Sequence, residues 1–218
     1  MELQIDSLQA LQAARCIADY AIEEGVKDAE IRCRPTYDHM GAVLADSVLQ
    51  AGLNYASVVK PRVQSILESF PHARTVDVLV EVVRHEGSGN FLQWRHQEKT
   101  DRFDALISFL VDVEIRSTAD FGEALNDDQF RHDIRQLRGV GPKTVDYMAC
   151  LVGVDCIAVD RHIKGFAQNA GFMQDNYELL KDIFSFAADL LDMRRREFDA
   201  WVWQYQVNKS NPQLAFAF

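Results

Sequence analysis

Apolar residues recur every three or four positions along most of the chain. Residues 8–22 read LQALQAARCIADYAI and residues 179–191 read LLKDIFSFAADLL, and both runs have the period of one face of an α-helix. Sustained alternation of apolar and polar residues, the pattern of a half-buried β-strand, is nearly absent. The sequence therefore predicts an all-α protein built from roughly ten or more short helices.

Residues that can cap a helix precede many of the apolar runs, because their side-chain oxygens accept a bond from the first backbone N–H groups. The helix starts expected on this basis are Asp6 or Ser7, Thr75, Thr100 or Asp101, and Thr118 or Asp120. The breaks between helices are short, at residues 32–38, 70–75, 86–90 and 139–141. No linker is therefore expected to divide the chain into independent domains.

Composition narrows the class of protein without identifying it. Of the 218 residues, 48% are hydrophobic and 26% are charged, as in ordinary globular proteins. No apolar stretch is long enough to span a membrane, and the first residues do not resemble a secretory signal, so we expect a cytoplasmic protein with no membrane partner. The cysteines at 16, 33, 150 and 156 lack the paired spacing of zinc sites and are expected to be small buried thiols.

Charge is unevenly distributed along the chain. The formal net charge is −10, which taken alone argues against a protein that coats nucleic acid nonspecifically. Residues 131–164 contain six basic and four acidic residues, so this stretch carries +2 while the remainder carries −12. A positive segment in a negative chain marks a local site more clearly than the total charge does.

A glycine turn lies at the centre of this basic segment. Residues 131–138 are predicted to form a helix that ends near Arg138, and Pro142 suits the first position of the next helix. Between them, Gly139 and Gly141 permit the positive φ values of a tight turn and let a ligand approach the backbone. The free N–H groups at the start of the second helix can hold a phosphate without a basic side chain.

Lys143 and Asp160 suggest chemistry at this turn. Lys143 falls in the first turn of the second helix, where a cation is disfavoured, so its amine should lose a proton more easily than an exposed lysine. Asp160 precedes another helix and can cap it. An amine and a carboxylate are the pair that Schiff-base chemistry needs. Singly, a glycine turn, a solvated lysine and a capping aspartate are ordinary features, and it is their combination that favours a functional site.

The same segment resembles the helix-hairpin-helix DNA glycosylases of the endonuclease III and 8-oxoguanine glycosylase superfamily. The similar pattern is L-x-G-V-G-x-K-T followed by V-D-x-H, and Asp146 also fits the 8-oxoguanine branch. The matching residues are Leu137, Gly139, Val140, Gly141, Lys143, Thr144, Val159, Asp160 and His162. The strong similarity covers about thirty residues, with weaker similarity near residues 44–59 and after residue 107.

The resemblance implies a two-lobed helical DNA glycosylase fold, with a central lobe at approximately residues 36–154 and a second lobe formed by residues 1–35 and 155–218. It further implies a bifunctional DNA glycosylase and AP lyase of base excision repair, acting as a monomer on duplex DNA with a damaged base. Lys143 would be the nucleophile and Asp160 its acidic partner. An oxidised purine is slightly favoured as the substrate because of Asp146.

The resemblance also implies how DNA would be held. Backbone N–H groups of the hairpin would grip a phosphate, with DNA contacts from Gly139, Val140, Gly141 and Thr144, and with Arg138 in place of the family's proline. A monovalent cation could sit on the carbonyls of Arg135, Leu137 and Val140. The four cysteines that bind an iron-sulfur cluster in endonuclease III relatives are missing after Asp160, so we expect no cluster and no other metal.

Residues that would fill the gap left by a flipped nucleotide, or stack on its base, are less well defined. Gln50, Leu53 and Asn54 are candidates for the wedge, although Gly52 could occupy that position itself. Tyr147 is the favoured base-pocket residue because it lies one helical turn after Lys143. Trp201, Trp203 and Tyr205 could also stack on a flipped base, but aromatic residues at such spacing mostly fill cores. The basic run at 194–196 could meet DNA phosphate, but a charge run on a terminal helix is usually a solvated face. Two rival hypotheses remain, a noncatalytic hairpin DNA-binding protein and a protein-interaction domain.

Overall fold

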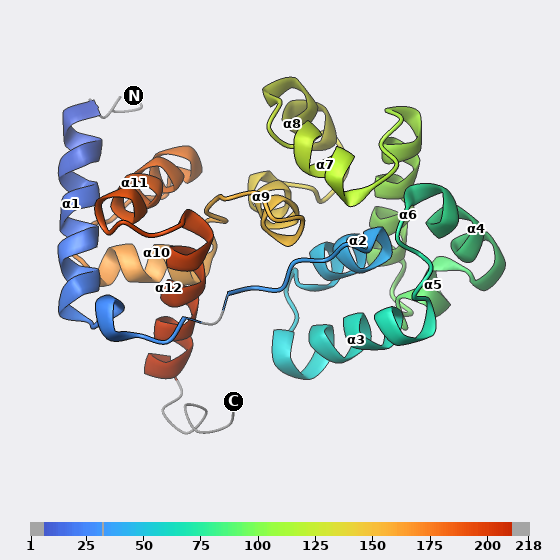
Figure 1. Ribbon diagram of the computed structural model, residues 1–218, viewed down its shortest axis with the longest axis horizontal. Helices are drawn as coiled ribbons and strands as arrows, with labels where there is room; N and C mark the ends of the chain where they lie inside the picture. The colour runs from blue at the N-terminus through green and yellow to red at the C-terminus, as the bar shows by residue number, and fades with distance from the viewer. Residues whose placement is uncertain (1–6, 32, 211–218) are drawn as a thin grey trace. The chain divides into compact units, whose positions relative to one another are not determined.

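The computed structural model describes residues 7–31 and 33–210, and within these ranges the chain forms helices and no strands (Figure 1). The prediction of an all-α protein is confirmed. The helices are α1 (Ser7–Glu23), the 3-10 turn η1 (Val26–Asp28), α2 (Met40–Leu49), the π-helical turn η2 (Tyr55–Val59), α3 (Lys60–Ser69), α4 (Val76–Glu86), α5 (Ser88–Phe91), α6 (Gln97–Asp112), α7 (Thr118–Ala124), α8 (Asp128–Ile134), α9 (Pro142–Leu151), α10 (Arg161–Asn169), α11 (Tyr177–Leu190) and α12 (Arg195–Ser210). None of these helices is long and apolar enough to cross a membrane.

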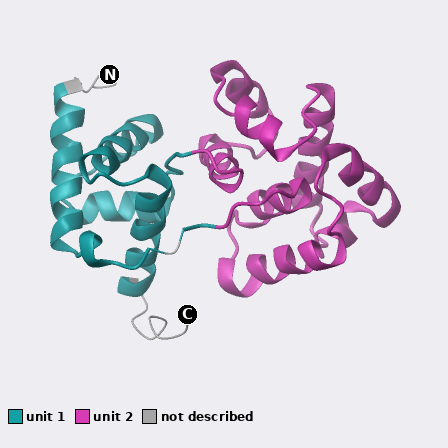
Figure 2. Cartoon of the chain, viewed as in Figure 1, with its two compact units in different colours: residues 1–34, 155–218 teal, residues 35–154 magenta. Residues whose placement is uncertain are grey.

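The chain divides into two compact units (Figure 2). Unit 1 consists of residues 1–34 and 155–218 and contains α1, α10, α11 and α12. Unit 2 consists of residues 35–154 and contains α2 to α9. Unit 1 is therefore assembled from the two ends of the chain, while unit 2 is continuous in sequence.

An aromatic cluster fills the core of unit 1. The Phe166 ring lies 5.5 Å from the Trp201 ring and 6.1 Å from the Phe184 ring, measured between ring centroids. Trp201 is only 4% exposed and stacks on Phe198 at 6.1 Å. Buried aromatic rings supply much of the apolar area that stabilises a small core. Trp201 is therefore a core residue of unit 1.

The central element of unit 2 is α2, in which every residue from Met40 to Leu49 is buried. A helix that is apolar on nearly all sides is stable only when other helices surround it, and α3, α4, α6 and α9 pack around α2. Two polar residues, Asp46 and Ser47, are enclosed with it. A buried carboxylate in such a helix needs hydrogen-bond partners, and those of Asp46 belong to the candidate site.

Several predicted helix starts agree with the structure. Thr75 caps α4 by accepting a bond from Val78 N, and Asp160 caps α10. Ser7 is the first residue of α1, whereas Asp6 lies outside the described residues.

Other predicted helix boundaries are wrong by a few residues. The α6 helix begins at Gln97, and the Thr100 hydroxyl donates to Gln97 O within its first turn, so neither Thr100 nor Asp101 is the cap. The cap of α7 is Ser117, which forms a reciprocal capping box with Asp120. The α8 helix ends at Ile134 because tighter i→i−3 bonds replace the α-helical pattern in the residues that follow.

Candidate functional site

The hairpin that precedes α9 needs only one of its two glycines for backbone reasons. Gly139 has φ +81°, in the left-handed region, and a Cβ at this position would run into the Arg102 guanidinium. Val140 is buried, and its N–H donates to Leu137 O at 3.0 Å, which closes the turn. Gly141 has φ −100° and open space where a Cβ would lie. The expected left-handed geometry is therefore present at Gly139 and absent at Gly141.

Helix α9 begins directly after this turn. Pro142 occupies its first turn as predicted, and Gly141 at the N-cap offers no side-chain cap. The N–H groups of Thr144 and Val145 both turn back to Gly141 O, at 3.0 and 3.2 Å. Thr144 is buried at 8% exposure, whereas Arg138 is exposed. The proposed cation at the carbonyls of Arg135, Leu137 and Val140, and the DNA contacts of these hairpin residues, stay predictions.

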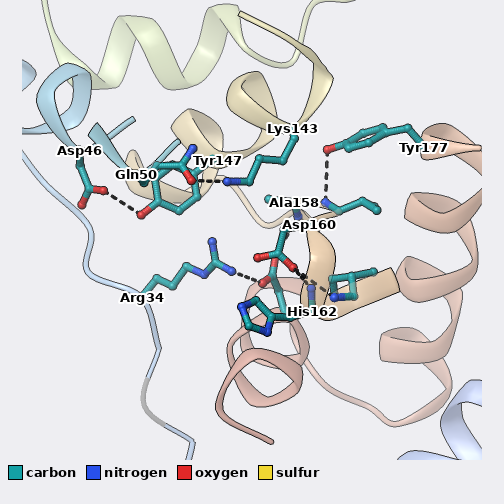
Figure 3. A network of polar contacts seen from close by, with 12 residues as sticks. Arg34, Asp46, Gln50, Lys143, Tyr147, Ala158, Asp160, His162 and Tyr177 are labelled. Carbon is teal, nitrogen blue, oxygen red and sulfur yellow. Dashed lines mark hydrogen bonds and ion pairs between the residues drawn. The ribbon is translucent and has the colours of Figure 1, made fainter. Parts of the chain in front are cut away.

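Lys143 is held from two sides within unit 2 (Figure 3). Its Nζ donates a hydrogen bond to Gln50 Oε1. The same nitrogen lies 5.1 Å from the centre of the Tyr147 ring, within the range of a cation–π interaction. Gln50, which the sequence indicated as a DNA contact, is the C-cap residue of α2 and contacts the lysine itself. Sequence spacing gave no sign of this pair, because 93 positions separate the two residues.

Tyr147 joins the lysine to a buried carboxylate. Its hydroxyl donates to Asp46 Oδ1 at 2.8 Å, and the residue is only 5% exposed. Base stacking by Tyr147 stays a prediction, and it would require the covered ring to become accessible.

Asp46 is the functional candidate that the sequence analysis missed. It is fully buried, and besides Tyr147 it accepts bonds from Tyr37 OH at 3.0 Å and Tyr55 OH at 3.1 Å. Burial raises the pKa of both Tyr37 and Tyr55, and the nearby Asp46 charge raises it further, so both phenols remain donors. The one available sequence signal was an acidic residue within the apolar run GAVLADSVL.

Asn54 has a local structural role. Its side chain accepts a bond from Ser57 N at 3.0 Å and so caps the π-helical turn η2, although the residue is exposed. Gly52 in the same loop has φ +77°, with open space around the position of a Cβ. Which of Gln50, Gly52, Leu53 and Asn54 would fill the gap left by a flipped nucleotide stays a prediction. Gln50 differs from the other three in that it accepts a hydrogen bond from Lys143.

Asp146 pairs with Arg131. The Asp146 carboxylate, on α9, is 1% exposed and forms an ion pair with the Arg131 guanidinium, on α8. The same guanidinium donates to Leu125 O at 2.9 Å. A buried carboxylate with a close cationic partner is explained by packing between helices. The argument for an oxidised purine, which depended on Asp146, is weaker for that reason.

In unit 1, Asp160 stands at the start of α10 (Figure 3). Its Oδ1 accepts bonds from His162 N at 2.8 Å and Ile163 N at 3.1 Å. A carboxylate at this end of a helix is also stabilised by the helix dipole. The predicted cap is confirmed, and the part that Asp160 takes in a reaction stays a prediction.

A second buried carboxylate supports the segment before Asp160. Asp199 of α12 is 1% exposed, pairs with Arg34 at 2.7 Å and accepts Ala158 N at 2.8 Å. Tyr177 OH accepts Val159 N at 3.3 Å. These bonds fix the backbone of residues 158 and 159 next to the Asp160 cap, and no sequence motif indicated them.

The basic run at 194–196 is partly used within unit 1. Asp155 accepts the backbone N–H groups of Arg195 and Arg196, at 3.3 and 3.0 Å, and so caps α12. The Arg195 guanidinium pairs with Asp189 at 3.2 Å, and Arg196 donates to Arg34 O at 3.0 Å. Local structure therefore explains these two arginines.

Of the cysteines expected to be buried, Cys150 and Cys156 are buried but Cys16 and Cys33 are exposed. Cys16 lies on α1 beside core residues such as Ile17 but on a different face of the helix, which explains its exposure. Among the residues that the structure describes, no three His, Cys, Asp or Glu side chains come together as a metal site would require. The absence of an iron-sulfur cluster stays a prediction.

Comparison with known proteins assigns a class to this architecture. Over 94% of this chain and 98% of the other, the fold is similar to that of the H. pylori 3-methyladenine DNA glycosylase MagIII bound to 1,N6-ethenoadenine, with a TM-score of 0.53 and 18% sequence identity. The helical DNA glycosylase fold expected from the hairpin motif is therefore confirmed.

The chain belongs to the family described as Domain of unknown function (DUF8548), whose model matches residues 17–207. No curated protein matches the sequence. The family description names no activity, so the function must be argued from the site.

Proposed function

We propose that this protein is a DNA glycosylase with AP lyase activity, which removes a damaged purine from duplex DNA through a Schiff base on Lys143. The observation that carries the proposal is the Lys143 amine in the first turn of α9, directly after the glycine hairpin and held by Gln50 and Tyr147. It occurs in a chain with the DNA glycosylase fold. A turn that serves only to join helices gives no reason for an amine held in this way.

The hairpin supplies a way to grip DNA despite the net charge of −10. Gly141 has open space where a Cβ would lie, so a phosphate can approach the backbone at the start of α9. N–H groups at a helix N-terminus favour an anion. Exposed Arg138 can add a phosphate contact on the same turn.

The reaction begins with a flipped nucleotide. With its amine deprotonated, Lys143 attacks C1′ through the nitrogen lone pair. The bond from C1′ to the base breaks, its electron pair leaves with the base, and the proton lost from the attacking nitrogen neutralises the departing base. The sugar ring opens to a Schiff base, which loses a proton from C2′ and expels the 3′ phosphate by β-elimination. Asp160 is assigned the acidic role, in which it stabilises the positive charge that develops on the sugar or moves protons.

Two lines of argument bear on the substrate. The resemblance at Asp146 favours an oxidised purine, but the pairing of Asp146 with Arg131 offers another explanation for that residue. The similar structure is named for 3-methyladenine and contains 1,N6-ethenoadenine. We therefore propose that the substrate is a damaged purine, and the test compares oxidised with alkylated bases.

The test uses duplexes that carry 8-oxoguanine, 1,N6-ethenoadenine or an abasic site, and it measures released base and cleaved strand separately. We expect the natural protein to release one of the bases and to nick the abasic duplex. Lys143→Gln should lose both activities, and Asp160→Asn should be slower by about 100-fold or more. Base release without nicking would contradict the lyase assignment, and duplex binding without either product would favour the noncatalytic DNA-binding protein.

A further inference from the structure

Two helices of unit 2 meet through paired side chains around Lys143. Asp46 and Gln50 lie one turn apart along α2 and its C-cap, and Lys143 and Tyr147 lie one turn apart on α9. Gln50 contacts Lys143, and Asp46 contacts Tyr147, so the pairs run in opposite directions along the two helices (Figure 3). We call these four residues the ladder.

Asp46 is an unusual member of a helical core. It is fully buried, and three tyrosine hydroxyls donate to it. Hydrogen bonds of this kind compensate a buried carboxylate for the loss of water. Two of the donors, Tyr37 and Tyr55, suffice to satisfy Oδ2, and the third, Tyr147, binds Oδ1. Tyr147 is also the donor whose ring lies against the lysine amine.

The bond between Tyr147 OH and Asp46 therefore fixes the ring that Lys143 contacts. A ring tied at its hydroxyl cannot tilt freely, so its face keeps a constant direction toward Nζ at 5.1 Å. Gln50 Oε1 accepts a bond from the same nitrogen. The amine is thus restrained by one direct contact and by one contact that Asp46 stabilises.

We propose that Asp46 and Gln50 are positioning residues for the Lys143 amine, Gln50 through a direct hydrogen bond and Asp46 through the Tyr147 ring. The proposal deepens the proposed function and rests on it, because a positioned amine matters most when it must attack C1′. A reacting group that is misplaced by about 1 Å can lose about 100-fold in rate. Neither Asp46 nor Gln50 needs to touch the substrate in this role.

Tyr37 provides the matched control for Tyr147. Tyr147→Phe and Tyr37→Phe each remove one phenol donor from the same carboxylate, and the Tyr147 ring additionally lies against the lysine amine. Tyr55 is not used as a control because its hydroxyl interacts with Tyr147 as well as with Asp46. If Asp46 serves only stability, the Tyr147 variant should not differ from the Tyr37 variant. Gln50→Leu removes the direct contact while keeping a side chain of similar size.

The experiment combines two readouts on the full-length protein. The first is the rate of borohydride trapping on an abasic duplex at saturating protein. The second is the NMR signal of the Lys143 Cε methylene in carbon-13 lysine-labelled protein without DNA, assigned by its loss in Lys143→Gln and shifted by the current of the Tyr147 ring. Circular dichroism and thermal unfolding check that each variant is folded.

We expect Tyr147→Phe and Gln50→Leu to slow trapping by about 10-fold to 100-fold and to move the Lys143 signal. Tyr37→Phe should change the trapping rate by less than about 3-fold and leave the signal in place. Equal effects of Tyr147→Phe and Tyr37→Phe would overturn the positioning role. If the natural protein forms no adduct, the proposed lyase function fails, and the NMR signal alone decides whether the ladder positions the amine.

Discussion

Gly139 and Gly141 flank the same valine, yet their backbones impose different demands. Gly139 adopts φ +81°, which costs a residue with a Cβ about 1–2 kcal/mol, and its neighbour is the Arg102 guanidinium. Gly141 adopts φ −100°, and nothing lies within 4 Å of the position that a Cβ would take. The first glycine therefore shapes the turn, and the second leaves room outside it.

Alanine variants should separate these two roles. Gly139→Ala is expected to lower the free energy of unfolding by at least about 1–2 kcal/mol, measured by urea denaturation. Gly141→Ala should change it by less than about 0.5 kcal/mol but weaken binding to duplex DNA, because its Cβ would stand where a phosphate approaches. Unchanged DNA affinity in the Gly141 variant would contradict the proposed phosphate grip.

His39 should make the stability of the protein depend on pH. It is buried, its Nδ1 accepts a bond from Ala42 N at 3.0 Å, and its Nε2 donates to Phe70 O at 2.8 Å. Burial lowers the pKa of His39 below its ordinary value of 6.5, so the neutral ring is the folded form. As the pH falls below about 6.5, the unfolded chain takes up the proton first, and the free energy of unfolding falls.

His39→Asn tests this coupling, because asparagine can keep the helix cap but does not titrate. We expect the natural protein to lose stability below about pH 6.5 more steeply than the variant, by up to about 1.4 kcal/mol per pH unit. Chemical denaturation at a series of pH values measures both slopes. Parallel slopes would show that His39 titrates alike in the folded and unfolded states.

Individual residues were predicted from sequence where their partners are close along the chain. The cap by Asp160 uses N–H groups two and three positions away, so a local pattern was sufficient. Tyr147 and Asp46 are 101 positions apart, and Arg34 and Asp199 are 165 apart. Contacts at such distances depend on how helices pack, which spacing within one segment does not reveal.

At the level of elements, apolar periodicity located the helices better than their ends. The α6 helix begins at Gln97, ahead of the predicted caps, and its N-cap residue His96 makes no side-chain capping bond. The α8 helix ends earlier than predicted, in a tighter turn. Periodicity reports which face a helix buries. Helix ends depend on which backbone groups find other partners, and these partners were not visible in the pattern.

The end of α2 illustrates a partner of this kind. Lys99, from α6, donates from Nζ to Val48 O and Ala51 O, both at 2.8 Å. The last carbonyls of an α-helix have no N–H partner within the helix, and the Lys99 amine supplies a donor for two carbonyls at the end of α2. Gln50, the residue that contacts Lys143, lies between these two carbonyls in sequence.

Lys99→Met should keep the length of the side chain and remove these bonds. We expect a loss of about 1–3 kcal/mol in the free energy of unfolding, measured by urea denaturation, because the carbonyls would lose a charged donor. Lys60→Met, at an exposed position on α3, serves as the control and should change stability by less than about 0.5 kcal/mol. Equal losses in the two variants would show that Lys99 does not stabilise α2 in this way.

For the whole molecule, the sequence predicted the fold class correctly because the hairpin motif and helical periodicity are both local features. The helical DNA glycosylase fold is confirmed by a structure that shares only 18% of its residues with this chain. The sequence could not establish the catalytic activity, the damaged base that is the substrate, or the pairing of Asp146 with Arg131, since these depend on how the helices pack.

The uneven charge of the chain should appear in how DNA binding responds to salt. Each phosphate contact that displaces a counterion adds about −0.9 to the slope of log affinity against log salt concentration. Arg138 is exposed on the hairpin, so Arg138→Ala should make the slope shallower by about 0.9. Arg15→Ala removes an exposed charge from α1, paired with Asp19, and should leave the slope unchanged. Equal slopes for all three proteins would exclude the predicted phosphate contact of Arg138.

The most direct test of the central claim is borohydride trapping on a duplex that contains an abasic site. The account predicts a covalent protein–DNA adduct on a denaturing gel, with peptide mass spectrometry locating the DNA on Lys143, and no adduct for Lys143→Gln under the same conditions. An adduct on another residue, or none from a protein that binds the same duplex, would contradict the assignment of Lys143 as the nucleophile.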